Sequence, residues 1–351
     1  MGNQYNEPAI GIIKVASWVL LIVLLVVIMK TMSFLFIPLS ISLLFCYALG
    51  IPLDFLQRFP IPSFMRTLLV ILFIAGLVYL LGRLVSVNIK EFQGQLPGFE
   101  EKFWEYARSM LAWLNISPDQ VREIYGSFLK SFSGMSLKPV GTLVQWLSGS
   151  FFSFLGNMIW VLLFMIFMLA ERESFTKRIV KGFGKTRSES VLAALGRINK
   201  AVQDYLGLKT LISMLTGVLV TLTLFVLDVP FAVLWGVLSF MLNFIPNIGS
   251  LIAVLPPVAI ALFESGSFGK MFIVAFLLIV IQTAVGSYLE PKVMGKGLNL
   301  SPLVVILSLV FWGWMWGIPG MLLSVPLTAA IKIACEQLDS TRTIAVLMSG
   351  K

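Results

Sequence analysis

The residues best suited to chemistry lie in the middle of an apolar run, which Asn243-Phe-Ile-Pro246-Asn247-Ile-Gly249 interrupts. Pro246 lacks a backbone donor, and Gly249 permits conformations closed to other residues. A helix broken there frees N–H and C=O groups, which a membrane tolerates only where protein buries them or water lines a cavity. The amides of Asn243 and Asn247 could bind the hydroxyls or carbonyls of a polar substrate. The pattern predicts a transport site; the alternative is that both asparagines only cap helix ends.

One further uncharged polar side chain lies inside an apolar span. Gln282 stands in the middle of the predicted span 271–289 and has no polar partner nearby in the sequence. A polar group in the hydrocarbon region is costly, so a functional role is its default interpretation. Glutamine also joins membrane helices through hydrogen bonds. Gln282 is therefore either a binding residue or an inter-helix hydrogen-bonding residue.

Four charged residues flank two predicted spans on the same side of the membrane. Asp204 and Lys209 lie at the start of the span 207–227, and their spacing of five does not suit a local salt bridge. They are candidates to reach other segments as a cytoplasmic gate, or to form an interfacial charge pair. Glu290 and Lys292 end the later span. The Glu290 carboxylate is either a proton or cation site, or a structural group that caps the helix and pairs with a lysine.

The sequence argues against catalysis. Histidine is absent, which excludes His-ligated metals, Ser-His triads and histidine proton relays. Cys46 and Cys335 lie in apolar sequence and imply no disulfide framework. Gly184-Lys185-Thr186 lacks the earlier glycine of a phosphate loop, because Ile179 stands at that position. We therefore expect no enzyme activity, no catalytic residues, no cofactor and no metal site.

Composition places these residues in a membrane. The 351-residue chain is 58% hydrophobic and only 12% charged, with a mean hydropathy of +0.95, whereas soluble domains are about 25% charged. Runs near the length that crosses a bilayer predict an all-α polytopic membrane protein with about seven or eight transmembrane or re-entrant segments. The net charge of +9 lies mostly in loops, where it sets orientation. The lipid bilayer is thus a predicted partner and nucleic acid is not.

The chain divides into five predicted parts. Residues 1–88 contain three transmembrane helices (about 12–30, 33–51 and 67–88), and residues 89–147 form an extracytoplasmic amphipathic helical insertion. Residues 148–206 contain a fourth span (about 149–170) and a basic cytoplasmic helical segment. Residues 207–336 form the transport core, and residues 337–351 form the tail. Residues 171–209 carry nine Lys or Arg against four acids, and Arg58 and Arg66 follow the second span. Basic loops stay inside, so we expect a cytoplasmic amino terminus.

Two elements of the core, 230–263 and 302–334, show the same order of prolines. One proline opens each element, a second breaks it and a third follows: Pro230, Pro246 and Pro256 in the first, and Pro302, Pro319 and Pro326 in the second. Each element is too long for one upright span, and the helices before them run in opposite senses. This predicts an inverted repeat of two broken hairpins, with Pro319 and Gly320 also on the transport path. The alternative is chance, because glycine and proline are common in membrane helices.

The carboxy-terminal half carries an ordered set of motifs. They are Asp204-Tyr-Leu-Gly-Leu-Lys209, Asp228-Val-Pro230, Asn243-Phe-Ile-Pro-Asn-Ile-Gly249, Leu289-Glu-Pro-Lys-Val-Met-Gly295, Leu300-Ser-Pro302, Gly317-Ile-Pro-Gly320 and Ser324-Val-Pro326. Together they resemble the autoinducer-2 exporter family, also called PerM-like permeases. The resemblance covers nearly the whole chain in layout and is specific from about 195 to 335. The family usually has Gly-Pro after the Ile-Gly of the broken element, where this chain has Ser250-Leu251.

The resemblance implies a multi-pass protein of the bacterial cytoplasmic membrane, plausibly a homo-oligomer, for which we predict a pentamer. Family members are linked to export of a small signalling sugar derivative, and others look like ion/proton antiporters. The leading prediction is a secondary exporter of a small polar molecule such as an autoinducer-2-like metabolite, with alternating access at the broken hairpins. A cation (Na⁺ or Li⁺)/proton antiporter, which would need Asp204 and Glu290, remains an alternative. So does a membrane scaffold that binds a partner through 89–147.

Overall fold

The computed structural model of the chain describes residues 7–48, 56, 58–113, 139–246, 248–294, 298–337 and 341–350. The main helices are α1 (Glu7–Thr31), α2 (Ser33–Ala48), α4 (Ser63–Trp113), α6 (Pro139–Val226), α7 (Ala232–Leu242), α8 (Ile248–Ser265), α9 (Phe268–Gln282), the π-helix η1 (Thr283–Leu289), α10 (Glu290–Met294), α11 (Pro302–Trp316), α12 (Ile318–Glu336) and α13 (Arg342–Met348).

The described residues form a helical membrane protein. Their one β-type contact is an isolated bridge between Leu300 and Ser349. Five described helices are long and apolar enough to cross a membrane, and the bent pair α1–α2 brings the number to six. Large apolar side chains cover the outer surfaces of these helices; Phe225, for example, is 76% exposed. Such surfaces are stable in lipid rather than in water. The predicted all-α polytopic fold is confirmed.

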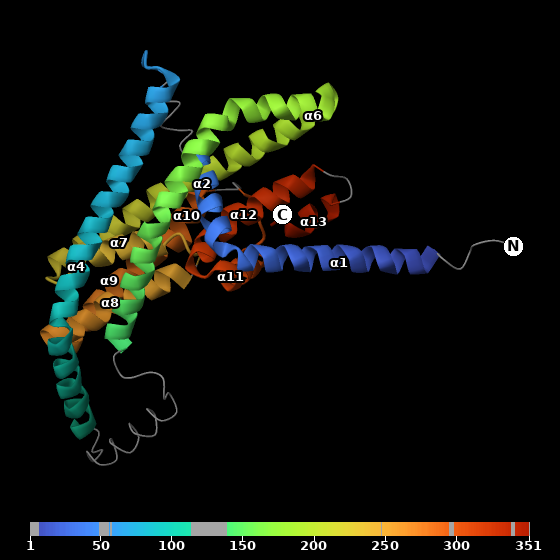
Figure 1. The fold of residues 1–351 in the computed structure, drawn as a ribbon. Coiled ribbons are helices and arrows are strands. Elements are labelled where there is room, and N and C mark those ends of the chain that lie inside the picture. Colours follow the sequence, from blue (N-terminus) through green and yellow to red (C-terminus); the bar gives the residue numbers. More distant parts are fainter. Residues whose placement is uncertain are drawn as a thin grey trace.

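The amino-terminal helices differ from three parallel spans. The break between α1 and α2 bends the chain by 90°, and Figure 1 shows α1 projecting sideways from the rest of the protein. Two helices at this angle cannot both follow the membrane normal. The three transmembrane helices predicted in 1–88 are therefore not arranged as three upright crossings. Each apolar run alone has a suitable length, and the sequence carries no signal for the angle between them.

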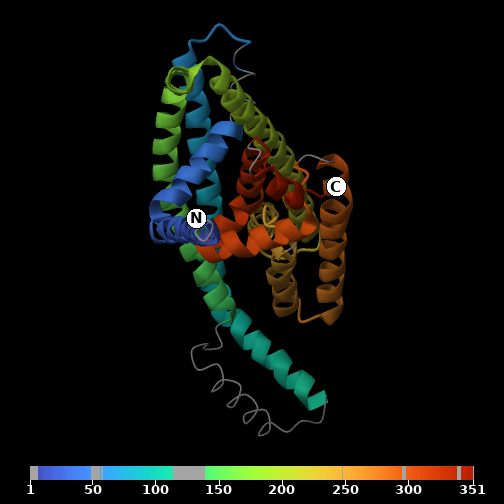
Figure 2. The ribbon, with the colours of Figure 1, turned by 90° about the vertical axis from the view of Figure 1, so that its right-hand side faces the viewer.

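The predicted boundary between the third span and the insertion is not a break in the helix. α4 runs without interruption for 51 residues, about 75 Å at 1.5 Å per residue, which is more than twice the hydrocarbon thickness. Its membrane-spanning part is Leu68–Phe92. Figures 1 and 2 show its later part projecting beyond the other described helices. The middle of the predicted insertion, residues 114–138, lies outside the described residues.

α6 contains two predicted spans and the basic segment between them. The helix is interrupted at Gly184, whose φ of 72° and ψ of 169° favour glycine. Figures 1 and 2 show the chain reversing its direction there, so α6 is a helical hairpin whose second arm runs back toward α7. That second arm is apolar enough to span a membrane from Ser188 to Val226. The basic segment thus forms the far end of a long helical hairpin.

Both predicted breaks in the carboxy-terminal half are present. α7 ends at Leu242 and α8 begins at Ile248. α11 ends at Trp316 and α12 begins at Ile318, with Gly317 between them at a positive φ of 65°. α7 and α11 have only 11 and 15 residues, which is too short to cross a bilayer. The helices of each pair pack against each other, so each element is a broken hairpin.

The main hydrophobic core lies where the first hairpin packs between α6, α9 and α4. Its fully buried centre includes Phe92 of α4, Trp235 of α7 and Leu278 of α9. The Phe92 ring contacts the Trp235 ring edge-on, with 5.8 Å between centroids. α6 and α7 approach closely, because a Cβ on Gly217 would lie 2.8 Å from the Gly236 carbonyl oxygen. This core holds α6, α7 and α9 together at one end of the site described next.

Candidate functional site

Three buried polar side chains follow one face of α6. Lys209, Ser213 and Thr216 are spaced by four and three residues, so they lie one above another on the helix. Lys209 is 3% exposed, and Ser213 and Thr216 have no exposed surface. The same face continues with Val220 and Leu224, which belong to the main hydrophobic core. The face therefore changes from polar to apolar along its length. We call its three polar residues the α6 polar stripe.

The first member of the α6 polar stripe, Lys209, forms an ion pair with Glu290 of α10. The lysine is almost completely buried, whereas the glutamate side chain is 21% exposed. Tyr205, one turn earlier on α6, lies within electrostatic range of the same carboxylate. Burying a charge is tolerated when it is paired, and here the partner comes from another segment. Lys209 thus reaches across to a different helix, and Glu290 pairs with a lysine.

The other two charged candidates lie apart from this pair. Asp204 is exposed on α6. Lys292 is also exposed, and its Nζ atom lies 5.7 Å from the centre of the Tyr288 ring. The structure therefore brings together Lys209 and Glu290, but it brings neither Asp204 nor Lys292 to their contact.

The second member of the α6 polar stripe contacts the break of the first hairpin. Asn243 follows the last residue of α7, and its side-chain nitrogen donates a hydrogen bond to Ser213 Oγ at 3.0 Å. Asn243 is 6% exposed, so both groups are buried. Pro246 lies in the short connection before α8, and Asn247 lies outside the described residues. The contact ties the helix break directly to α6.

Two buried polar atoms among the described residues have no hydrogen-bond partner. They are Nε2 of Gln282 and Oγ of Ser239. Gln282 is 9% exposed and Ser239 has no exposed surface. Gln282 is the last residue of α9, and the π-helix η1 separates it from Glu290. π-Helical segments are rare and occur frequently at functional sites. An unpaired buried polar group is also uncommon, so both atoms require an explanation.

The tips of the two hairpins share one packing device. A Cβ on Gly249 would lie 1.7 Å from the Leu242 carbonyl oxygen, and one on Gly320 would lie 1.9 Å from the Trp312 carbonyl oxygen. In each hairpin, the first turn of the second helix therefore presses its glycine against the end of the first helix. Pro319 lies beside Gly320 in the first turn of α12. This common geometry supports a repeat of the two elements.

The tryptophans near the second tip serve packing. Trp312 Nε1 donates to Thr328 Oγ1 at 3.2 Å within the hairpin. Trp316 Nε1 donates to the Met29 carbonyl at 3.0 Å, and the Lys30 ammonium lies 3.6 Å from the centre of the Trp314 ring. These contacts attach the end of α1 to the second hairpin.

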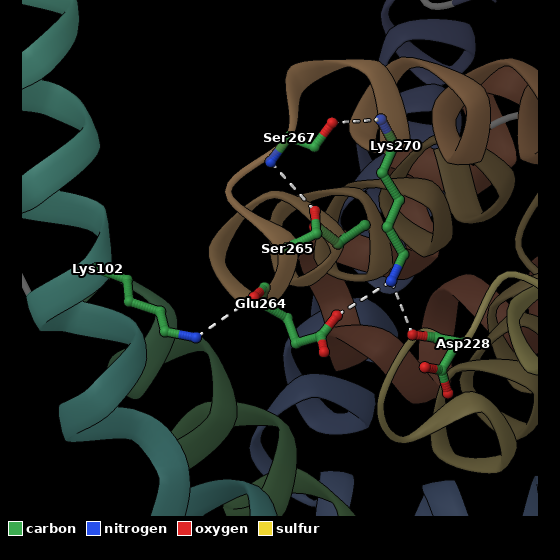
Figure 3. A network of polar contacts seen from close by, with 7 residues as sticks. Lys102, Asp228, Glu264, Ser265, Ser267 and Lys270 are labelled. Carbon is green, nitrogen blue, oxygen red and sulfur yellow. Dashed lines mark hydrogen bonds and ion pairs between the residues drawn. The ribbon is translucent and has the colours of Figure 1, made fainter.

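A polar network joins two turns and the extended part of α4 at the end of α6 that leads into α7 (Figure 3). Lys270 of α9 donates to the Asp228 carbonyl at 2.9 Å and pairs with the Glu264 carboxylate at 3.1 Å. Lys102, on the projecting part of α4, donates to the Glu264 carbonyl at 3.3 Å. The network thus connects the α6–α7 turn, the α8–α9 turn and the α4 extension.

A second set of contacts fixes the start of the second hairpin. Lys332 of α12 is 3% exposed and donates to the Asn299 carbonyl at 3.0 Å. The backbone N–H of Ser301 donates to the Met348 carbonyl at 3.0 Å, and that of Gly350 donates to the Asn299 carbonyl at 3.2 Å. Residues 299–301 are therefore held by α12, by the last residue of α13 and by Gly350.

Several site residues were not predicted from the sequence. Ser213, Thr216 and Ser239 are small hydroxyl residues in apolar helices, where such residues commonly bond to their own backbone. Thr216 does so, because its Oγ1 donates to the Ile212 carbonyl at 3.0 Å. The helical spacing of Lys209, Ser213 and Thr216 was an available signal. No sequence signal distinguishes Ser239 or the π-helical form of η1.

The amino-acid sequence of the chain is similar to those of known transport proteins. The chain matches the family model described as AI-2E family transporter over residues 17–340. It is 34% identical over 319 residues to the AI-2 transport protein TqsA of Escherichia coli (strain K12), covering 89% of each chain. It is 35% identical over 298 residues to a putative transport protein of Haemophilus influenzae, covering 82% of each. It is 30% identical over 318 residues to a putative transport protein of Borreliella burgdorferi, covering 90% of this chain and 84% of the relative.

Proposed function

Because this chain belongs to the AI-2E family of transporters, we propose that it is a secondary transporter that exports a small polar molecule across the bacterial inner membrane. Membership of the family makes the protein a membrane transporter. The Escherichia coli relative is named as an AI-2 transport protein, and a similar signalling metabolite is our proposed substrate. The chain has no nucleotide-binding motif, so an ion gradient or the gradient of the solute would supply the energy.

The observation that carries this proposal is the buried polar contact between the first hairpin break and α6. Asn243 at the end of α7 and Ser213 on α6 bond within an otherwise apolar bundle. One turn away, Lys209 and Glu290 close the same end of the bundle with an ion pair. Broken helices with polar partners are where transporters place their substrates. We propose that the two hairpins rearrange around this region to give alternating access, with Pro246, Asn247, Gly249, Pro319 and Gly320 at their tips.

The proposed orientation places the basic turn of α6 and the amino terminus in the cytoplasm. Residues 171–209 contain nine basic and four acidic residues, and basic segments remain inside. The α4 extension and the Lys270 network are then on the outer side. The Lys209–Glu290 pair lies toward the cytoplasm and acts as an inner gate. In an exporter this gate must open first to admit the solute.

The direct test is flux in proteoliposomes with the pH gradient, the sodium gradient and the candidate solute varied independently. A purified autoinducer-2 preparation is the first solute. Pro246→Leu removes the helix-breaking residue at the tip without filling the close contact at Gly249. We expect this variant to insert and assemble but to lose flux. Near-normal flux per folded molecule would contradict a transport role for the break.

The buried ion pair supports one second candidate, a Na⁺ or Li⁺/proton antiporter. Glu290 is partly exposed and faces a buried lysine, an arrangement in which a carboxylate can exchange its partner for a cation or a proton. Neutralising Glu290 would then abolish cation-driven proton flux. A carrier of a neutral solute would retain turnover in the Glu290→Gln variant that remains folded. The same proteoliposomes, loaded with a pH-sensitive dye, separate the two candidates.

We also propose that the transporter is a homo-oligomer, with a pentamer as the specific expectation. Among residues 16–25 of α1, the side chains are mostly apolar and all are exposed: Trp18, Leu20 and Ile22 are 66%, 71% and 57% exposed. Only its end is attached to the second hairpin. A helix with so little support from its own chain is suited to contact neighbouring subunits. A monomeric mass in both mild detergent and nanodiscs would contradict this proposal.

A further inference from the structure

The two unpaired polar atoms lie on different helices of the core. Ser239 Oγ on α7 has no exposed surface, and Gln282 Nε2 belongs to a side chain that is 9% exposed at the end of α9. A buried donor without an acceptor destabilises the folded state. Glutamine that simply joined helices would have a partner, and neither side chain has one here. Each atom therefore points to a missing hydrogen-bonding group.

Packing places Ser239 and Gln282 at the same depth in the bundle. On α7, Ser239 lies between Trp235 in the main hydrophobic core and Asn243 on the α6 polar stripe. Along α9, η1 and α10, Gln282 lies between Leu278, which belongs to the same core, and Glu290, which forms the ion pair with Lys209. On α6, the residues between the core and the Asn243 contact are those between Val220 and Ser213, and they include Thr216.

Counting along the helices gives the same result. Thr216 is seven residues from Lys209, about 10 Å at a rise of 1.5 Å per residue. Ser239 is four residues, or about 6 Å, beyond Asn243, which itself bonds to α6 one turn beyond Lys209. Gln282 is eight residues before Glu290, and because the intervening segment is π-helical it lies closer than the roughly 12 Å that an α-helix would span. All three therefore lie at most about 12 Å along the helices from the ion pair, at the level of Thr216 on the second arm of α6.

Along the helices, this depth lies between apolar side chains and bonded polar groups, and it contains uncharged polar side chains. Toward the Lys270 network it is bounded by the apolar side chains of Trp235, Leu278 and Val220. Toward the cytoplasmic side it is bounded by the Asn243–Ser213 hydrogen bond and the Lys209–Glu290 ion pair. The described residues 210–227, 232–246, 248–263 and 271–289 include no Asp or Glu, so these parts of the helices offer a cation no carboxylate. A hydroxyl or carbonyl oxygen could accept from Gln282 Nε2, and a ligand hydroxyl could donate to Ser239 or Thr216.

We propose that Ser239, Thr216 and Gln282 form a binding level for an uncharged, oxygen-bearing solute between α6, α7 and α9. This inference rests on the proposed transport function and adds to it the residues and the charge selectivity of the site. Gln282 Nε2 donates to a ligand oxygen. Ser239 Oγ donates or accepts. Thr216 keeps its hydrogen bond to Ile212 and offers the lone pairs of Oγ1. The solute supplies the partners that the two buried groups lack.

The first test measures stability, because a binding role and a structural role predict opposite signs. Ser239→Ala and Gln282→Met remove unpaired groups, so both variants should unfold at a higher temperature than the wild type in detergent. The matched control is Ser308→Ala in the second hairpin, where a buried serine already donates to the Val305 carbonyl at 2.9 Å. That control should show no increase. A lower unfolding temperature for Ser239→Ala and Gln282→Met would overturn the proposal.

The second test measures access with named probes and requires no knowledge of the natural solute. Ser239→Cys and Gln282→Cys, each in a Cys46→Ser/Cys335→Ser background in proteoliposomes, are treated with neutral methyl methanethiosulfonate or a cationic trimethylammonium-ethyl methanethiosulfonate. We expect the neutral reagent to react at least tenfold faster than the cationic one. Ser324→Cys is the control, because Ser324 has no exposed surface and donates to the Met321 carbonyl. Equal rates for both reagents, or reaction no faster than at Ser324→Cys, would overturn the proposal.

The two tests separate this inference from the proposed function. Neither unfolding temperature nor thiol labelling depends on measuring flux. If the wild type carries no solute but the labelling and stability patterns hold, the transport proposal fails and the binding level stands. If the wild type carries solute and Ser239→Ala and Gln282→Met retain full flux, the transport proposal stands and the binding level is wrong.

Discussion

Lys209 and Glu290 lie 81 residues apart in the sequence and form an ion pair across the contact between α6 and α10. Lys209 belongs to the helix that precedes the first hairpin, and Glu290 begins α10, the last helix before the second hairpin. The pair therefore links the two related halves of the core at one point. Since both hairpins depend on these helices for their positions, a change at the pair can reach both tips.

Removing either partner of this pair should have unequal effects. Glu290→Gln leaves a lysine that is 3% exposed without its counter-charge, whereas Lys209→Met leaves a glutamate that is 21% exposed and can still contact solvent. We expect Glu290→Gln to lower stability by about 3 kcal/mol or more and Lys209→Met to lower it less. Thermal unfolding in detergent measures both. The exposed Lys292→Met serves as the control, and the opposite ranking would show that the lysine is not the more deeply buried partner.

The glycines at the hairpin tips should not tolerate a methyl group. Gly249→Ala and Gly320→Ala place a Cβ within 2 Å of a carbonyl oxygen, at 1.7 and 1.9 Å respectively. The backbone must shift, so we expect a large loss of folded yield in both variants. Gly156→Ala is the matched control, because nothing lies within 4 Å of its Cβ position and alanine favours a helix. Normal yield of both tip variants would contradict the close packing of the tips.

The hydrogen bond between Asn243 and Ser213 should appear as a coupling energy. In a double-mutant cycle of Asn243→Ala and Ser213→Ala, we expect an interaction of about 1 kcal/mol, because each single change breaks the same bond. Unfolding free energies from denaturant titration give the cycle. Ser213→Ala combined with Thr328→Ala, in the other hairpin, should be additive. A coupling near zero for Asn243 and Ser213 would mean that their contact contributes nothing to stability.

The outer network should affect stability only modestly. Lys270 and Glu264 are 25% and 36% exposed at their side chains, so their ion pair is partly screened by solvent. Lys270→Met should lower stability by about 1 kcal/mol or less, and high salt should reduce the difference. Unfolding temperatures at low and high salt provide the measurement. A salt-independent loss of several kcal/mol would instead indicate a tightly buried structural pair.

The proposed topology predicts labelling from opposite faces. Lys102 on the α4 extension and Lys200 on the second arm of α6 are both exposed. Single cysteines introduced as Lys102→Cys and Lys200→Cys, with Cys46 and Cys335 replaced by serine, should react with an impermeant reagent from the outside and the inside respectively. Intact cells and inside-out vesicles distinguish the two faces. Reaction of both positions from the same face would contradict the topology.

The features that local sequence fixes were predictable, and those that depend on helix packing were not. Pro246 and Pro319 were predicted to mark the two breaks because proline acts on its own backbone; the second break falls two residues earlier, at Gly317, and Pro319 lies in the first turn of α12. A distant partner for Lys209 was one of two alternatives, because its spacing from Asp204 does not suit a local salt bridge. The angle between α1 and α2 was not predictable, since each run satisfies the length of a span by itself. Ser239 was also missed, because its significance comes from the partner that it lacks in the packed bundle.

The contacts of residues 299–301 have a consequence for biosynthesis. This short segment leads into α11, yet its backbone partners are Met348, the last residue of α13, and Gly350, which follows α13. The lysine that holds Asn299 lies late in α12. During translation, the start of the second hairpin therefore waits for some 50 further residues before its contacts exist. The first hairpin, whose partner Ser213 precedes it, can settle as soon as it emerges. The two related halves are thus completed in a fixed order, and the second is the step at which an incompletely made chain remains exposed to quality-control proteases.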